Sequence, residues 1–284
     1  MIKIIECPRD AMQGIKEFIP TDKKIRYLNQ LLKVGFDTID FGSFVSPKAI
    51  PQMKDTASVM EGIDLSSNDT ALLAIVANIR GAREAASFEK ITYLGFPLSI
   101  SETFQLRNTH KSIASALEEL VAIKDVCTRH NKKLVTYISM GFGNPYNDPY
   151  DVSMVNGFID VLRTLGSDVI SLADTIGVAT PKLITEIVGS ALRSYSDMEI
   201  GVHLHSSPQS ATEKIDAAYR SGCRRFDGAL KGYGGCPMAK DDLVGNIATE
   251  SIIAHLYAAG EQTKIDESAL VEAMKLADEI FPKN

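Results

Sequence analysis

The sequence predicts an α/β fold, a (β/α)8 TIM barrel followed by an additional C-terminal helix. Eight short runs rich in β-branched residues recur along the 284 residues, and amphipathic segments of helical length lie between most of them. Regular alternation of strand and helix indicates a parallel sheet with helical crossovers. Eight such units in roughly 250 residues suit a closed barrel better than an open doubly wound sheet, which usually has about five or six strands.

The expected strands, in order, are residues 2–5, 37–41, 72–76, 90–94, 133–139, 168–173, 199–205 and 224–229. The expected helices are residues 21–34, 79–87, 111–129, 149–165, 182–194, 210–221, 243–258 and 267–280, of which the last follows the barrel. Thr180 before Pro181 has the pattern of a helix N-cap followed by proline at the first helical position, and Ser46 before Pro47 repeats it. No low-complexity linker divides the chain, so we expect one catalytic domain over residues 1–284.

Composition narrows the class of protein. There are 30 Lys and Arg against 36 Asp and Glu, with a net charge of -6 and no long basic run, which argues against a nucleic-acid partner. No apolar stretch approaches the roughly 18 residues of a membrane span, and the N-terminus does not resemble a targeting peptide. The four cysteines form no CxxC pair, which indicates a reducing compartment. We therefore expect a soluble cytoplasmic protein without a membrane partner.

In a barrel of this kind, active sites lie at the carboxyl ends of the strands. Four expected strands end in polar residues, and these clusters are predicted to meet at one mouth. They are residues 6–13, 40–43, 173–175 and 203–205.

The pair His203 and His205 gives the clearest indication of chemistry. Two residues apart on a strand, both side chains share one face, while Val202 and Leu204 face the helices. Imidazole is a common ligand of divalent transition-type ions. The pair alone fits hydrogen-bonded histidines at the rim of the core equally well, but an Asp10 at the same mouth favours a metal site.

Arg9 and Asp10 follow the first strand as a cation beside an anion. A carboxylate can ligate a divalent ion, and an arginine can hold a carboxylate or a developing enolate through its planar donors. An Arg-Asp dipeptide elsewhere would be read as a surface ion pair. Its place at a strand exit favours a role in the site.

A glycine-rich segment after the eighth strand carries Cys236. Such a segment can close over the mouth and present a thiol that donates a proton, although a free cysteine is more often a small buried apolar residue. Asn246 can offer an oxygen to a metal or cap the following helix, and its spacing alone favours the cap.

Together these segments resemble the 3-hydroxy-3-methylglutaryl-CoA lyases, a metal-dependent family built on this barrel. The likeness spans nearly the whole chain, and the order of its motifs is more specific than any one of them. The matching strings are RDAMQ at 9–13, SFVSPKAIPQM at 43–53, SLADTIGVATP at 171–181, HLH at 203–205, GGCP at 234–237 and GNIATE at 245–250.

The resemblance implies a site and a reaction. The implied metal ligands are Asp10, His203, His205 and Asn246, holding Mg²⁺ or Mn²⁺. The implied catalytic residues are Arg9, Cys236 and Asp40, and the implied substrate-binding residues are Arg9, Gln13, Ser43, Asp174 and Thr175. The reaction is a retro-Claisen cleavage of an acyl-CoA, 3-hydroxy-3-methylglutaryl-CoA, into acetyl-CoA and acetoacetate. Arg9 would stabilise the enolate and Cys236 would protonate it, while the base is open among Asp40, a metal-bound group and a histidine. The family also suggests a homodimer.

The sequence departs from the family pattern around the pocket. Ala11 replaces a glycine, Asp40 stands in place of glutamate and Ser206 in place of a common aspartate. Glu6 is one position nearer to the arginine than usual, and one extra residue separates Cys236 from Asn246. These changes leave the implied ligand set intact and bear on which acyl group is bound.

Three other functions are alternatives to the lyase. A condensing synthase of the isopropylmalate, citramalate or homocitrate type uses the same barrel and histidine pair, but typically has C-terminal domains for which this chain has no room. An aldolase acting on a hydroxy-keto acid is a second alternative. A non-catalytic metal-binding barrel is the third, and Arg9 and Cys236 argue against it.

Overall fold

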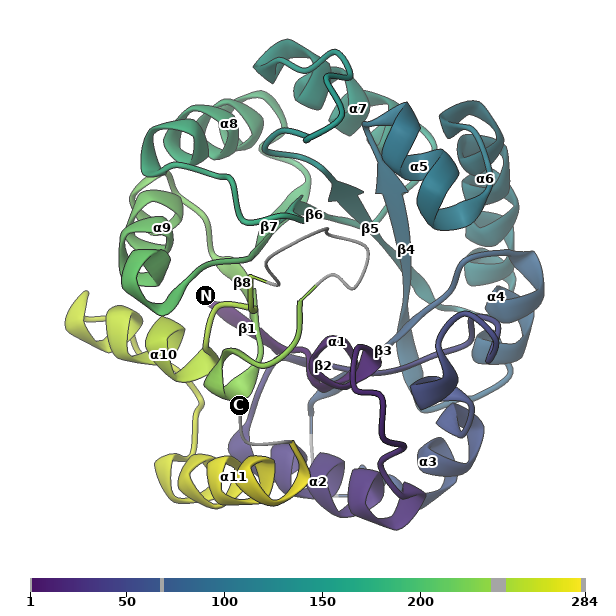
Figure 1. Cartoon of the computed structure of the whole chain (residues 1–284), viewed down its shortest axis with the longest axis vertical. Coiled ribbons are helices and arrows are strands. Elements are labelled where there is room, and N and C mark those ends of the chain that lie inside the picture. Colours follow the sequence, from purple (N-terminus) through teal and green to yellow (C-terminus); the bar gives the residue numbers. More distant parts are fainter. Residues whose placement is uncertain (1, 67–68, 236–243, 282–284) are drawn as a thin grey trace.

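A computed structural model describes residues 2–66, 69–235 and 244–281 and shows a closed barrel of eight parallel strands in sequence order, ringed by helices (Figure 1). The strands are β1 (Lys3–Glu6), β2 (Thr38–Ser43), β3 (Ala71–Ile75), β4 (Ile91–Ser99), β5 (Lys133–Ser139), β6 (Val169–Asp174), β7 (Glu199–Leu204) and β8 (Arg225–Gly228). The predicted TIM barrel is therefore confirmed.

Eight of the helices correspond to those expected from the sequence, and three short ones, Pro8–Gln13, Thr56–Gly62 and Glu102–Thr109, were not expected. The helices are α1 (Pro8–Gln13), α2 (Thr21–Val34), α3 (Thr56–Gly62), α4 (Ile79–Ala86), α5 (Glu102–Thr109), α6 (Ile113–Arg129), α7 (Val152–Thr164), α8 (Pro181–Ser194), α9 (Pro208–Arg220), α10 (Thr249–Ala258) and α11 (Glu267–Ile280), with short 3-10 turns η1 (Pro51–Met53) and η2 (Leu230–Gly232). Among these helices, none is long and apolar enough to cross a membrane.

The predicted additional C-terminal helix is α11, which packs along α2 at the edge of the ring (Figure 1). Asp266 begins it, with a side-chain oxygen that accepts a hydrogen bond from the Ala269 N–H at 2.8 Å. The rings of Tyr27 and Phe281 meet edge to face at 5.8 Å between centroids. The helix therefore extends the outer apolar layer and closes no part of the barrel itself.

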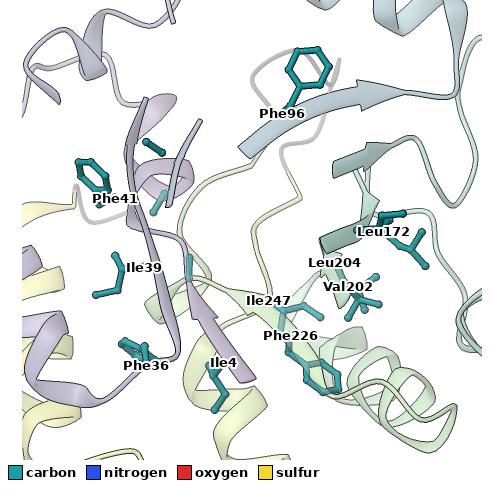
Figure 2. Close-up of a cluster of buried hydrophobic side chains, with 14 of the residues drawn as sticks. Ile4, Phe36, Ile39, Phe41, Phe96, Leu172, Val202, Leu204, Phe226 and Ile247 are labelled. Atoms are coloured by element: carbon teal, nitrogen blue, oxygen red, sulfur yellow. The ribbon is translucent and has the colours of Figure 1, made fainter. Parts of the chain in front are cut away.

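Apolar side chains pack on both faces of the strands, outside and inside the barrel. The outer layer lies between strands and helices, and Figure 2 shows part of it, with Ile39 of β2, Val202 and Leu204 of β7 and Phe226 of β8. A smaller inner cluster fills one side of the barrel and consists of Leu73, Ile75, Tyr93, Val135, Tyr137 and Val169. Alternation along β7 places Val202 and Leu204 in the outer layer, so His203 faces the barrel interior as the sequence predicts.

Two local predictions were wrong. The helix expected at residues 243–258 begins only at Thr249, because the preceding segment runs extended and bridges Asn246 to His205 and Ala248 to Ala229. Ser46 begins no helix: its hydroxyl accepts from the Lys48 N–H within a turn. The cap at Thr180 is confirmed, since its hydroxyl accepts from the Leu183 N–H at 3.2 Å.

Candidate active site

Asp10, His203 and His205 meet at the carboxyl ends of the strands. One ligand atom from each lies within 4.8 Å of those of the other two, and the three residues are buried. The histidines lie on and just beyond the end of β7, and the short helix α1 turns Asp10 toward them directly after β1. Two imidazoles and a carboxylate at this spacing can hold one divalent ion.

Each histidine has its Nδ1 atom engaged by a neighbouring oxygen. His205 Nδ1 lies 3.0 Å from the Val244 carbonyl oxygen, and His203 Nδ1 lies 3.3 Å from Asp227 Oδ2. A carbonyl oxygen can only accept, so His205 carries its proton on Nδ1 and keeps the Nε2 lone pair free. The same arrangement at His203 is typical of histidine ligands that are oriented by a carboxylate.

Asn246 completes this group from the extended segment before α10. Its Nδ2 donates to Asp10 Oδ2 at 2.7 Å and to the Tyr233 carbonyl at 2.9 Å. The N-cap position of α10 is Ala248, so the structure places Asn246 beside Asp10 and not at the cap that its spacing favoured. All four predicted ligands therefore lie together.

Neighbouring charges keep Asp10 in its carboxylate form. Burial acts to raise its pKa, but Arg9, the two histidines and the hydrogen bond from Asn246 outweigh burial and lower the pKa to about 2. Burial and the neighbouring His203 lower the pKa of His205. At neutral pH the cluster thus offers a carboxylate and a neutral imidazole.

Arg9 joins Asp10 to Asp40. Its Nη2 donates to Asp40 Oδ2 at 2.6 Å and its Nη1 to Asp10 Oδ1 at 3.1 Å. Gln13 accepts from Arg9 Nη1 at 2.9 Å and donates to Asp10 Oδ1 at 2.7 Å. Burial raises the pKa of Asp40 despite the opposing effect of Arg9. Arg9, Asp10, Gln13 and Asp40 therefore form one largely buried polar network, which shares Asp10 with the metal-type cluster.

The other predicted substrate-binding residues form hydrogen bonds with neighbouring residues of the barrel. The Ser43 hydroxyl donates to the Ile75 carbonyl at 3.3 Å, and the Thr175 hydroxyl accepts from the Met140 N–H at 2.8 Å. Asp174 is 1% exposed and accepts from Lys214 Nζ at 2.8 Å. These three residues lie at the same end of the barrel, and their contact with substrate stays a prediction.

Two residues of the site were missed from the sequence, Asp227 and Lys214. Lys214 Nζ also donates to the His205 carbonyl at 2.8 Å, so it joins the strand that carries a predicted ligand to Asp174. The sequence does hold a sign that Lys214 is special. It falls on the apolar face of α9 with Ala211, Ile215 and Ala218, where a lysine is unexpected. Asp227 gave only the weak signal of an acidic residue within a buried strand.

Cys236 lies outside the described residues, but the start of its loop is visible. Gly234 has a φ of +94°, and a Cβ there would lie 2.7 Å from Asn246 Nδ2 and 2.8 Å from the Ala11 Cα. Only glycine suits that backbone and that close approach. The loop therefore leaves η2 in direct contact with the predicted metal ligands.

A groove of about 1130 Å³ opens beside this cluster. Its walls include the segment between α1 and α2, the glycine-rich loop, the residues that follow His205 and the end of α11. Asn246, Lys16 and Lys23 are among the lining residues. The groove is large enough for an extended ligand that reaches the site.

A parallel barrel with an inward His-X-His pair, a carboxylate and an amide at the carboxyl ends of its strands defines a TIM-barrel protein with a metal-type site. The HMGL-like family model matches residues 2–277, and the chain belongs to this family.

Curated relatives and a solved structure agree with this membership. A 3-hydroxy-3-isohexenylglutaryl-CoA/hydroxymethylglutaryl-CoA lyase of Pseudomonas aeruginosa is 33% identical, with 96% of this chain and 90% of that protein covered. A hydroxymethylglutaryl-CoA lyase of Bacillus subtilis is 32% identical, with 97% and 91% covered. An HMG-CoA lyase from Acinetobacter baumannii, solved with coenzyme A and 3-methylmalate, is 33% identical and superposes with a TM-score of 0.91, covering 99% of this chain and 91% of that one.

Proposed function

We propose that the protein is a divalent-metal-dependent carbon-carbon lyase that cleaves 3-hydroxy-3-methylglutaryl-CoA into acetyl-CoA and acetoacetate. The observation that carries this proposal is the convergence of Asp10, His203, His205 and Asn246 next to the buried pair of Arg9 and Asp40. Full-length similarity to lyases named for this substrate supports the same activity.

Asp10, His203, His205 and Asn246 would hold the ion, and their nitrogen and oxygen donors suit Mg²⁺ or Mn²⁺. When bound, the ion would act as a Lewis acid and a template for the oxygens of the substrate. The second nitrogen of each histidine is already engaged, so the ligand orientation is set before the ion arrives.

Asp40 is the base we favour among the three groups that the sequence left open. Its carboxylate is buried at the site and has a raised pKa, whereas both histidines are committed through Nδ1 and face the predicted ion through the other nitrogen. Asp40 would take the proton of the C3 hydroxyl. The C2–C3 bond then breaks, C3 becomes the ketone of acetoacetate, and the electron pair passes to the thioester enolate.

Arg9 and Cys236 would act on that enolate. The Arg9 guanidinium is fixed by Asp40, Asp10 and Gln13, so it presents a positive charge that needs little reorganisation as negative charge develops on the thioester oxygen. The Cys236 thiol would donate the proton that converts the enolate into acetyl-CoA.

The groove beside Asn246 is the place we assign to the coenzyme A part of the substrate. Lys16 and Lys23 on its lining offer positive charge to phosphates, and the groove leads to the polar network at the mouth. The coenzyme A complex of the Acinetobacter relative supports an acyl-CoA ligand. A homodimer and a cytoplasmic location stay predictions.

A related acyl-CoA with a larger group on C3 is a second candidate substrate. The Pseudomonas relative is named for both 3-hydroxy-3-isohexenylglutaryl-CoA and the methyl compound. Measuring kcat/KM for the two thioesters side by side with Mg²⁺ or Mn²⁺ decides between them. We expect the methyl compound to have the higher value, and a higher value for the isohexenyl compound would assign the larger substrate instead.

A further inference from the structure

Below His203, the barrel interior holds a group of buried polar atoms that make no hydrogen bond within the described residues. They are Tyr137 Oη, Arg225 Nε, Arg225 Nη2 and Asp227 Oδ1. A buried polar atom without a partner costs about 1–3 kcal/mol, so four at one place call for an explanation. The set contains donors and acceptors that complement one another.

The strand pattern brings these atoms to one face. Arg225 and Asp227 alternate along β8 with Phe226, which belongs to the outer apolar layer, so both charged side chains face the interior. Asp227 pairs with His203 in the register of β7 and β8. The Tyr137 ring meets the His203 ring edge to face at 5.9 Å between centroids.

Asp227 is held at one oxygen only. Its Oδ2 lies 3.3 Å from His203 Nδ1 and 3.2 Å from Ser171 Oγ. Its Oδ1 is buried without a hydrogen bond in the part of the chain that the structure covers. A carboxylate fixed at a single oxygen can rotate about its last bond, and that rotation would misalign the imidazole that it orients.

Arg225 is anchored at the opposite end of the barrel. Its Nη1 donates to Glu199 Oε1 at 3.0 Å, and Glu199 also accepts from Lys3 Nζ at 2.8 Å. Gly201 makes room for its stem, because a Cβ there would lie 2.7 Å from Arg225 Cγ and 2.8 Å from Cδ. The rest of the guanidinium is thus held inside the barrel with Nε and Nη2 unbonded to described residues.

Arg225 and Asp227 have opposite charges but form no direct ion pair among the contacts of the described residues. Burial acts to lower the pKa of Arg225, and Asp227 and Tyr137 outweigh it, so these groups are electrostatically close. Groups that attract one another across a gap, with donors on one side and an acceptor on the other, match the two to four polar partners of a buried water.

We propose that ordered water among these buried atoms joins Arg225 and Tyr137 to Asp227 Oδ1, and that Arg225 thereby acts as a positioning residue for the predicted metal ligand His203. This inference rests on the proposed metal site. The carboxylate is then fixed at both oxygens, and the imidazole keeps Nε2 directed at the ion. Arg225 touches neither ion nor substrate and acts only through water and Asp227.

Metal binding by Arg225→Met tests the proposal, with Lys3→Met as the matched control. Each variant removes one of the cations on Glu199, but only Arg225→Met also removes the positive charge on the side of Asp227. Mutation of residues that orient a metal ligand typically lowers metal affinity by about 10–100-fold. We expect Arg225→Met to bind Mn²⁺ about tenfold more weakly, with kcat at saturating Mn²⁺ within about twofold of the wild type, and Lys3→Met to bind normally.

A double variant separates positioning from simple loss of stability. Because Arg225 acts through Asp227, Arg225→Met in an Asp227→Asn background should weaken Mn²⁺ binding no further. Equal Mn²⁺ affinity of Arg225→Met and wild type, or fully additive losses in the double variant, would overturn the inference. A wild type that binds no Mn²⁺ would instead overturn the proposed function.

Crystallography gives a readout that does not depend on activity. We expect water density within hydrogen-bond distance of Asp227 Oδ1 and of Arg225 Nε or Nη2 in the wild type. Tyr137→Phe, which removes a single hydroxyl and keeps the ring, should lose or shift that water and bind Mn²⁺ several-fold more weakly even if Arg225→Met does not fold. The absence of such water density in the wild type would contradict the proposal.

Discussion

Replacing Lys214 with methionine removes one partner of a buried ion pair and should destabilise the fold strongly. Lys214 Nζ donates to Asp174 Oδ2 and the His205 carbonyl at 2.8 Å and to the Gly177 carbonyl at 2.9 Å. The two charged side chains are 5% and 0% exposed. Removing one partner from such a pair costs about 3–5 kcal/mol, because the remaining charge stays buried. For a chain of this size that corresponds to a melting temperature lower by about 10 °C.

Urea unfolding followed by circular dichroism measures this cost. Asp174→Asn combined with Lys214→Met removes both charges, so we expect the double variant to be more stable than Lys214→Met alone. Lys182→Met, on the exposed face of α8, is the matched control and should stay within about 0.5 kcal/mol of the wild type. A cost below about 1 kcal/mol for Lys214→Met, or costs of the two single variants that simply add, would refute the reasoning.

Three further predictions concern the carboxyl end of the barrel. Cys236→Ala should lose most cleavage activity yet bind metal normally, whereas His203→Ala should lose both; normal turnover by the cysteine variant would remove the thiol from the mechanism. Burial raises the pKa of Glu6 from 4.5 to about 8, although hydrogen bonds from Thr249 and Leu230 act to lower it. The folded state therefore favours the protonated side chain. This contribution to stability is full below pH 4.5 and is lost as the pH rises toward 8. Denaturation of Glu6→Gln at several pH values should therefore show a smaller loss between pH 5 and 8, and identical pH profiles would disprove this. Gly234→Ala forces a side chain into left-handed backbone at about 1–2 kcal/mol, so we expect roughly tenfold lower kcat/KM, while Gly157→Ala in α7, where a Cβ meets nothing within 4 Å, should be unaffected.

The barrel could be predicted from local patterns because β-branched runs and amphipathic segments alternate regularly. Helix α5 (Glu102–Thr109) was missed because few of its residues are buried, chiefly Phe104 and Gln105, so the sequence shows little apolar periodicity there. The start of α10 was misplaced for a different reason. Residues 244–248 satisfy their backbone by bridging to β7 and β8, and no local propensity reports such long-range pairing.

The residues of the candidate site also fall into two groups, those that the sequence predicts and those that it does not. Two-residue periodicity on β7 placed His203 toward the interior, and the rule that barrel sites lie at strand ends brought Asp10 to the same mouth. The residues that contact the two predicted histidine ligands, Asp227 and Lys214, could not be predicted from spacing. Asp227 is 24 residues from His203 and meets it through the pairing of β8 with β7. Lys214 is 9 residues from His205 and reaches its carbonyl only when α9 packs back onto β7.

Product formation from 3-hydroxy-3-methylglutaryl-CoA tests the central claim most directly. Purified protein is incubated with the thioester and either Mg²⁺ or Mn²⁺, and acetyl-CoA and acetoacetate are measured in parallel, with EDTA and the His203→Ala variant as controls. We expect equal amounts of the two products, formed only when an ion is present and lost in the variant. No product with either ion, or undiminished product in EDTA, would contradict a metal-dependent cleavage at the site formed by Asp10, His203, His205 and Asn246.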